Sequence, residues 1–242
     1  MEQQTMLHLG KVLTVATGTA ALTLTQAIAV TTPAIDSLFA SESMQVLVTA
    51  QASPITYVPP NRGQPRQTQG TGSRGCEDTS EAIALSLLAP SNHTGLTVSA
   101  RPTFYWHLEN AVSVPVEFTL VEDDNPNPIY VRRFDSNDAG LTSVSLPEGR
   151  ELEEGKTYRW TVSVVCNPQR RSSDVFAQSW IERVSPSATL EASLAEATTA
   201  QETARAYARE GIWYDVLSEL NTDDARWEIV RSERLAAASR PE

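Results

Sequence analysis

The sequence predicts a mainly β fold with α: an antiparallel immunoglobulin- or fibronectin III-like β-sandwich, followed by a C-terminal helical hairpin. Two observations support this prediction. Between residues 76 and 184, apolar and polar residues alternate in short runs that turn residues separate, which is typical of antiparallel strands. In residues 185–242, apolar residues recur every three or four positions, which is typical of helices.

The composition is that of a chain able to bury a core, because 40% of its 242 residues are hydrophobic and 20% are charged. The formal net charge is -11. Binding of phosphate groups requires a basic surface, so we expect no nucleic-acid partner. The acidity by itself indicates solubility and little more.

Residues 1–29 have the pattern of a signal peptide. Lys11 precedes an apolar run that ends in the small-x-small motif Ala27-Ile28-Ala29, which is typical of a cleavage site. A second such motif, Ala50-Gln51-Ala52, makes cleavage as late as residue 52 an alternative, and an uncleaved membrane anchor is another. No second hydrophobic span follows. We therefore expect an exported protein, periplasmic or extracellular, with no membrane span after signal removal.

Residues 30–75 are predicted to form an extended linker, rich in proline and glycine toward its end. The stretch 53–75 contains no acidic residue but carries Arg62, Arg66 and Arg74. These arginines are candidate contacts for an anionic partner. The alternative is a solvated linker at the entrance of the domain.

The alternating pattern predicts seven strands in the sandwich domain. They lie at residues 96–100, 104–108, 114–120, 129–134, 141–146, 158–166 and 175–184. The strand 158–166 is the clearest, because it places Tyr158, Trp160 and Cys166 on one face and polar residues on the other. Residues 152–158 resemble a tyrosine corner, in which the tyrosine hydroxyl binds the backbone a few residues upstream.

Three helices are predicted after the sandwich. The first begins near Ser185-Pro186 and ends at Gly211, the second begins at Trp213, and the third follows Asn221 to Asp224. Residues 206–217 resemble the turn between the two helices of a tetratricopeptide repeat. A single unit of that kind either packs on the sandwich as a helical hairpin or forms a peptide-binding groove.

Few residues are available for chemistry. His93 and His107 are isolated, and with the two cysteines expected to pair in a disulfide, the ligands that remain are too few for a zinc site. The acidic turns at 122–124 and 135–140 are incomplete as calcium sites and are interpreted as hairpin turns. The sequence shows no nucleophile elbow and no phosphate-binding loop. We therefore predict no catalytic residue, no metal and no cofactor.

The two cysteines, Cys76 and Cys166, match the requirement for a single disulfide. In an exported chain they would form that bond. In a reducing compartment they would be two free buried thiols instead, and the sequence pattern alone leaves both alternatives open.

Several motifs resemble those of a known family. They are Tyr57 to Pro65 with Gly70 to Cys76, Arg101 to Phe104, Tyr158-Arg159-Trp160 with Cys166-Asn167-Pro168, Trp180 to Val184, Tyr207-Ala208 with Gly211 to Asp215, and Trp227 with Leu235 and Pro241. Together they resemble a secreted cyanobacterial family known only as a domain of unknown function, DUF928. The resemblance covers residues 57–241 and implies export and a disulfide between Cys76 and Cys166, but no activity. A shortened segment near residues 221–227 departs from the family pattern.

These observations predict an exported, non-catalytic binding module of the cell envelope. The predicted contacts are Arg62, Arg66 and Arg74 for an anionic polymer, and Trp213 and Tyr214 for an envelope protein. The last two are adjacent, so on a helix they face different directions. The alternatives are a glycan-binding protein, a carboxylate-dependent hydrolase and a structural hairpin that oligomerises. Two carboxylates facing across a cleft where helices and sandwich meet would favour the hydrolase, whereas a filled apolar junction would count against it.

Overall fold

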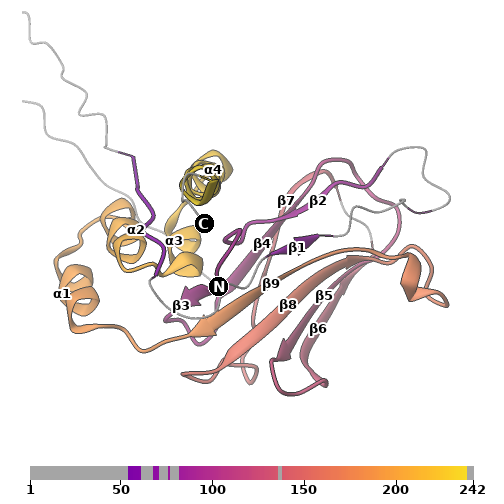
Figure 1. Ribbon diagram of the computed structural model, residues 1–242, viewed down its shortest axis with the longest axis horizontal. Helices are drawn as coiled ribbons and strands as arrows, with labels where there is room; N and C mark the ends of the chain where they lie inside the picture. The colour runs from indigo at the N-terminus through magenta and orange to yellow at the C-terminus, as the bar shows by residue number, and fades with distance from the viewer. Residues whose placement is uncertain (1–53, 61–67, 71–75, 77–81, 136–137, 239–242) are drawn as a thin grey trace, which may run out of the picture. The chain divides into compact units, whose positions relative to one another are not determined.

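The computed structural model describes residues 54–60, 68–70, 76, 82–135 and 138–238 (Figure 1). The described strands are β1 (Gln69–Gly70), β2 (Leu85–Leu87), β3 (Gly95–Thr97), β4 (Thr103–Leu108), β5 (Val116–Glu122), β6 (Pro128–Phe134), β7 (Gly140–Ser145), β8 (Thr157–Val164) and β9 (Val175–Arg183). The described α-helices are α1 (Ala188–Glu196), α2 (Ala200–Arg209), α3 (Trp213–Glu219) and α4 (Asp223–Ala238).

The strands form two sheets (Figure 1). The six-stranded sheet has the order β1-β9-β8-β5-β6, with β3 also paired to β9, and the three-stranded sheet has the order β2-β4-β7. Every pairing is antiparallel except that of β3 with β9, which is parallel. The predicted antiparallel architecture is therefore confirmed. Each of the seven predicted strands has a counterpart, and β1 and β2 are additional strands that the alternating pattern did not predict.

The core lies between the two sheets, because alternate residues of each strand face inward. The ring centroid of Phe104 on β4 lies 5.0 Å from that of Phe118 on β5 and 5.1 Å from that of Trp160 on β8. All three side chains are fully buried. Aromatic rings at such distances combine a large buried apolar area with favourable tilted packing, so these contacts hold the sheets together.

Two predicted features of β8 are confirmed. The Tyr158 hydroxyl accepts a hydrogen bond from the backbone N–H of Glu153 at 2.9 Å, as expected of a tyrosine corner, and burial raises the pKa of this hydroxyl. Cys166, which follows the end of β8, forms a disulfide with Cys76. The bond closes a loop between positions 90 residues apart, which restricts the unfolded chain.

The described parts of the predicted linker are packed into the fold. Residues 54–60, here called the arm, contain Tyr57, whose side chain is only 4% exposed. The Val58 N–H donates to the Ala208 carbonyl of α2 at 2.9 Å, and β1 pairs with β9 farther along the chain. At these residues the chain is part of the folded structure and not a solvated linker, because its backbone bonds to α2 and β9.

Four helices follow the sheets in the described residues, whereas three were predicted. The predicted first helix is divided because Thr199 starts a new one. Its hydroxyl accepts from the Glu202 N–H at 3.2 Å, and the Glu202 carboxylate accepts from the Thr199 N–H at 3.1 Å. This reciprocal capping box satisfies backbone donors at the start of α2 and separates it from α1.

The turn after α2 has the geometry expected of its glycine. Gly211 has a φ of 72°, a left-handed conformation that side chains disfavour. The Ile212 N–H donates to the Tyr207 carbonyl at 3.0 Å and the Gly211 N–H donates to the Ala208 carbonyl at 3.3 Å. This pair of bonds is a Schellman motif, and it ends the helix at the position that the sequence predicts.

α4 packs on outward-facing side chains of β4. The Trp227 ring lies 5.3 Å from the His107 ring, and the Arg226 guanidinium lies 4.7 Å from the centre of the Tyr105 ring. His107, expected at the surface of a strand, is therefore half-buried against α4. Within the described ranges, no helix combines the length and the apolar character needed to cross a membrane.

Candidate functional site

Trp213 and Tyr214, the predicted contacts for a protein partner, are core residues. Both side chains are 0% exposed. The Trp213 indole N–H donates to the Leu88 carbonyl at 3.0 Å, and the Tyr214 hydroxyl accepts from the Trp160 indole N–H at 2.7 Å. The prediction was wrong because α3 is buried at five successive residues. Adjacent side chains that face different directions therefore both meet protein.

The junction between the sheets and the helices is filled with apolar side chains. The ring centroid of Tyr214 lies 5.6 Å from that of Phe104, and the ring centroid of Trp213 lies 4.8 Å from that of Tyr57 on the arm. These residues belong to one continuous apolar cluster. Tyr57 of the arm, Trp213 and Tyr214 of α3 and Phe104 of β4 are consequently packed together in the core.

One carboxyl group is buried at this junction. Asp215 on α3 is 9% exposed, and its carboxylate accepts a hydrogen bond from the Val98 N–H at 3.2 Å. Burial raises the pKa of Asp215 to about 6, although hydrogen bonds from Thr97 and Val98 oppose the shift. The carboxylate binds the segment that follows β3, and its charged form is disfavoured there.

A second buried carboxyl group, that of Glu233 on α4, belongs to a polar network. It accepts hydrogen bonds from the N–H and the hydroxyl of Ser91, at 3.1 and 3.0 Å. His93 lies 3.8 Å from the same carboxylate and 2.9 Å from the Tyr57 hydroxyl, which donates to the Gly211 carbonyl. The network joins the arm, the segment after β2, the turn after α2 and α4, and we interpret it as structural.

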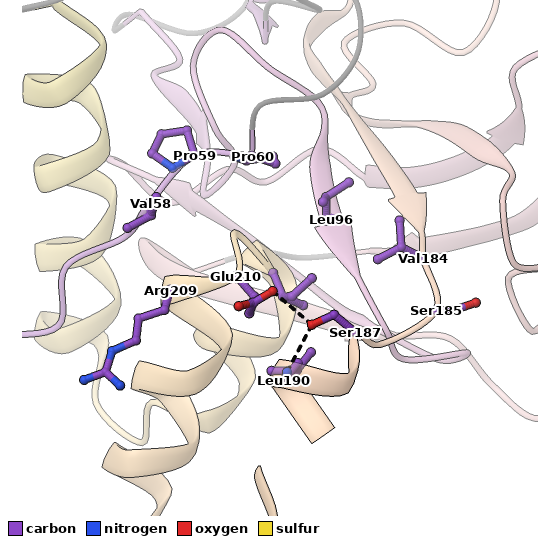
Figure 2. A pocket seen from close by; sticks show the side chains of 11 residues that line it. Val58, Pro59, Pro60, Leu96, Val184, Ser185, Ser187, Leu190, Arg209 and Glu210 are labelled. Atoms are coloured by element: carbon purple, nitrogen blue, oxygen red, sulfur yellow. Dashed lines mark hydrogen bonds between the residues drawn. The ribbon is translucent and has the colours of Figure 1, made fainter. Parts of the chain in front are cut away.

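A pocket of about 420 Å³ lies between the arm, α1 and the turn after α2 (Figure 2). Its walls come from segments that are far apart in the sequence. The lining residues are Val58, Pro59, Pro60, Leu96, Val184, Ser185, Ser187, Leu190, Arg209, Glu210 and Ile212. Seven of these eleven residues are apolar. Pockets of this volume and character bind small ligands or single side chains.

Local hydrogen bonds hold the polar groups of this pocket. The Ser187 hydroxyl accepts from the Leu190 N–H and donates to the Glu210 carboxylate, both at 3.0 Å, as Figure 2 shows. The Arg209 guanidinium is directed away from this pair (Figure 2). The Ser187 hydroxyl therefore both caps α1 and donates a hydrogen bond to Glu210, which fixes the position of these two polar groups at the edge of the pocket.

The remaining predicted site residues have two outcomes. Arg62, Arg66 and Arg74 lie outside the described residues. Cys76 and Cys166 are joined in the predicted disulfide. Among the residues that the structure describes, no group of three or more His, Cys, Asp or Glu side chains is arranged to hold a metal ion.

Sequence reasoning missed the pocket. Val58 and Pro59 stand in a proline-rich segment that is typical of a linker. Leu190 and Ile212 fit the apolar pattern of the helical region, which indicates burial and not a pocket. The available signal was the group of apolar residues Ile55, Tyr57 and Val58, which stands before the polar stretch 61–75. Such a group indicates that the arm packs against protein, but not against which element.

The comparisons with known proteins agree with the motifs quoted above. The family model described as Domain of Unknown Function (DUF928) matches residues 69–226. This range runs from β1 into the first turn of α4 and covers more than half of the chain. The comparison with curated proteins gave no match. The chain therefore belongs to the DUF928 family, as its motifs predict.

Proposed function

We propose that the protein is an exported, non-catalytic binding module of the cell envelope, and that it binds a protein partner through the pocket between the arm and α1. The observation that carries this proposal is the pocket itself, with a volume of about 420 Å³ and seven apolar lining residues. A pocket of this kind accommodates one large apolar side chain of a partner. Such buried anchors supply most of the binding energy of protein interfaces.

The walls of the pocket are held in place by the fold. Leu190 and Ile212 are 1% and 4% exposed, so their positions are set by packing. Val58 is 49% exposed, but its backbone is bonded to α2 through the Ala208 carbonyl. A preformed pocket lowers the conformational entropy lost on binding, which supports a binding function for this surface.

The disulfide between Cys76 and Cys166 supports export. Disulfides form and persist in oxidising compartments such as the periplasm and the extracellular space. The predicted signal peptide at residues 1–29 leads to the same proposal independently.

The placement of the buried acids supports a non-catalytic function. A hydrolase of the carboxylate type requires two carboxyl groups that face each other across an accessible cleft. Asp215 and Glu233 are both buried, and each accepts hydrogen bonds from the backbone of a neighbouring segment. The apolar cluster fills the space between α3 and the inner face of β4.

We also propose that the two sheets form an immunoglobulin- or fibronectin III-like sandwich. The hydrogen bond of Tyr158 to the backbone of Glu153 supports this relation, because a tyrosine corner is a recurrent feature of those folds. A crystal structure with a different order of strand connections would contradict it.

The function is tested with a matched pair of substitutions, Val58→Asp and Val131→Asp. The two valines are 49% and 48% exposed, but only Val58 lines the pocket. Tagged full-length protein is crosslinked in envelope fractions, and captured material is identified by mass spectrometry and glycan analysis. We expect a protein partner that Val58→Asp loses and Val131→Asp retains. Capture unaffected by Val58→Asp, or capture of a glycan alone, would contradict the proposal.

Arg62, Arg66 and Arg74 remain proposed contacts for an anionic envelope component, on the basis of their charge in a segment without acids. Replacing all three with glutamate should abolish retention on anionic envelope polymers. If every detected envelope interaction survives this replacement, the arginines have no role in binding.

A further inference from the structure

A second, larger depression lies at the other end of α2. Its volume is about 820 Å³, and it is formed by the start of the arm, the start of α2, the end of α3 and the first half of α4. The lining residues are Pro54, Ile55, Thr199, Ala200, Gln201, Glu219, Leu220, Asn221, Ala225, Glu228 and Ile229. The first pocket is lined by the last residue of α2, Arg209, so the two sites are separated by roughly 15 Å of helix.

The floor of this α2–α4 groove is apolar and fixed. Leu220 is 7% exposed and Ile229 is 2% exposed, and both belong to the main apolar cluster, against which Ile55 and Ala225 pack. The floor is therefore continuous with the core of the protein. An apolar group that enters the groove would meet a surface held in one conformation, which favours binding.

The walls of the groove carry charge of one sign. Glu219 at the end of α3 and Glu228 on α4 both line it, and none of its described lining residues is a lysine or an arginine. Arg226 on α4 is directed elsewhere: it donates to the Leu217 carbonyl and pairs with Asp223. The groove thus combines an apolar floor with two carboxylates, in a chain whose formal net charge is -11.

We propose that the α2–α4 groove binds a short segment of a partner protein in which an apolar side chain is flanked by lysine or arginine. The apolar side chain would contact Leu220 and Ile229, and the cationic groups would pair with Glu219 and Glu228. Charge complementarity selects this occupant over an acidic or neutral segment, because like charges at an interface disfavour association. The inference does not depend on the pocket between the arm and α1, which has different lining residues.

The test measures binding of labelled nine-residue peptides to the full-length protein by fluorescence anisotropy. One peptide alternates lysine with leucine, the second alternates glutamate with leucine, and the third alternates lysine with serine. We expect measurable binding of the lysine–leucine peptide only, weakened several-fold when the salt concentration rises from about 50 to about 300 mM, because salt screens exposed charges. Equal binding of the glutamate–leucine peptide would overturn the proposal.

Two double variants with the same change in net charge place the binding site. The double variant Glu219→Lys, Glu228→Lys reverses the charge of the groove. We expect it to weaken binding of the lysine–leucine peptide roughly tenfold or more. Glu109→Lys with Glu148→Lys reverses two exposed acids outside the groove and should leave the affinity within about twofold, because distant exposed charges are screened. If both double variants weaken peptide binding equally, the effect comes from the net charge of the protein, and the proposed binding site is wrong.

A third variant tests the apolar floor. Ala200 is exposed at the start of α2 and lines the groove, so Ala200→Trp should fill it without disturbing the core and should abolish peptide binding. Unchanged binding would overturn the proposed location. Sedimentation velocity tests whether a second copy of the chain occupies the groove. If the wild-type protein is a dimer and the Glu219→Lys, Glu228→Lys variant is a monomer, the groove binds a second copy, and the proposal of a partner segment is overturned.

Discussion

Replacing Asp215 with asparagine should stabilise the protein at neutral pH. The pKa of this buried carboxyl group is raised from 3.8 to about 6 by burial. Between these two values the folded state holds a proton that the unfolded state has released, so the free energy of unfolding falls as the pH rises. The stability that comes from keeping Asp215 protonated in the folded state is fully present below about pH 4 and is lost above about pH 6.

The magnitude follows from the size of the shift. One pKa unit corresponds to 1.36 kcal/mol, so a shift from 3.8 to about 6 amounts to about 3 kcal/mol. Asparagine avoids this penalty because it is never charged. Its side-chain oxygen can still accept the Val98 N–H that the carboxylate accepts at 3.2 Å. The substitution therefore removes the charge and keeps that hydrogen bond, while the carboxylate's second hydrogen bond, with Thr97, is the one that asparagine changes.

The assay is urea denaturation of the oxidised protein, followed by tryptophan fluorescence at about pH 4 and about pH 7.5, values that lie on either side of the Asp215 titration. The stability of Asp215→Asn relative to wild type should be greater at the higher pH by about 2–3 kcal/mol. Asp124→Asn, at an exposed turn position, is the matched control and should show no such difference. A stability difference for Asp215→Asn that is the same at both pH values would refute the reasoning.

Three further substitutions test the packing around α2 and α3. Tyr214→Phe leaves the buried Trp160 indole N–H without its acceptor, which should cost about 1–3 kcal/mol; an unchanged Tm in thermal denaturation would contradict this. Gly211→Ala should lower the urea midpoint more than Gly149→Ala. Both glycines have positive φ, but only a Cβ at Gly211 would lie 2.9 Å from an atom of the arm, so equal effects would exclude that contact. Thr199→Ala should cost about 1 kcal/mol through loss of the helix cap, and serine at this position should restore most of the stability; a serine variant as unstable as the alanine variant would show that the hydroxyl is not responsible.

The strands could be predicted from the sequence wherever one face of the strand is buried and the other is exposed to solvent. β8 shows this alternation over its whole length, with Tyr158 and Trp160 buried and Arg159 partly exposed. β2 was missed because only three residues pair, and two of them are half-buried, so no alternation can be recognised. β1 has only two residues, too few to show any alternation. It forms a strand because its backbone pairs with the edge of β9.

In the helical region, some features could be predicted from local sequence signals and others could not. The break between α1 and α2 is encoded by Thr199 followed three residues later by Glu202, a capping-box spacing that the apolar stripe concealed. The burial of both Trp213 and Tyr214 could not be read from spacing, because it depends on the arm and the sheets enclosing α3 from several sides. The pocket and the groove are likewise products of segments brought together only by the tertiary fold.

The attachment of the arm has a consequence for the order of folding. Tyr57 bonds to Gly211, 154 positions away, and Ser91 bonds to Glu233, 142 positions away. Contacts of such high sequence separation slow folding, because the chain loses much loop entropy before they form. The N-terminal part of the described chain therefore acquires its final environment only when the C-terminal helices are present. A ribosome-bound or truncated chain that ends before α3 should leave Tyr57 without its contact to Trp213 and should be a substrate for chaperones and proteases.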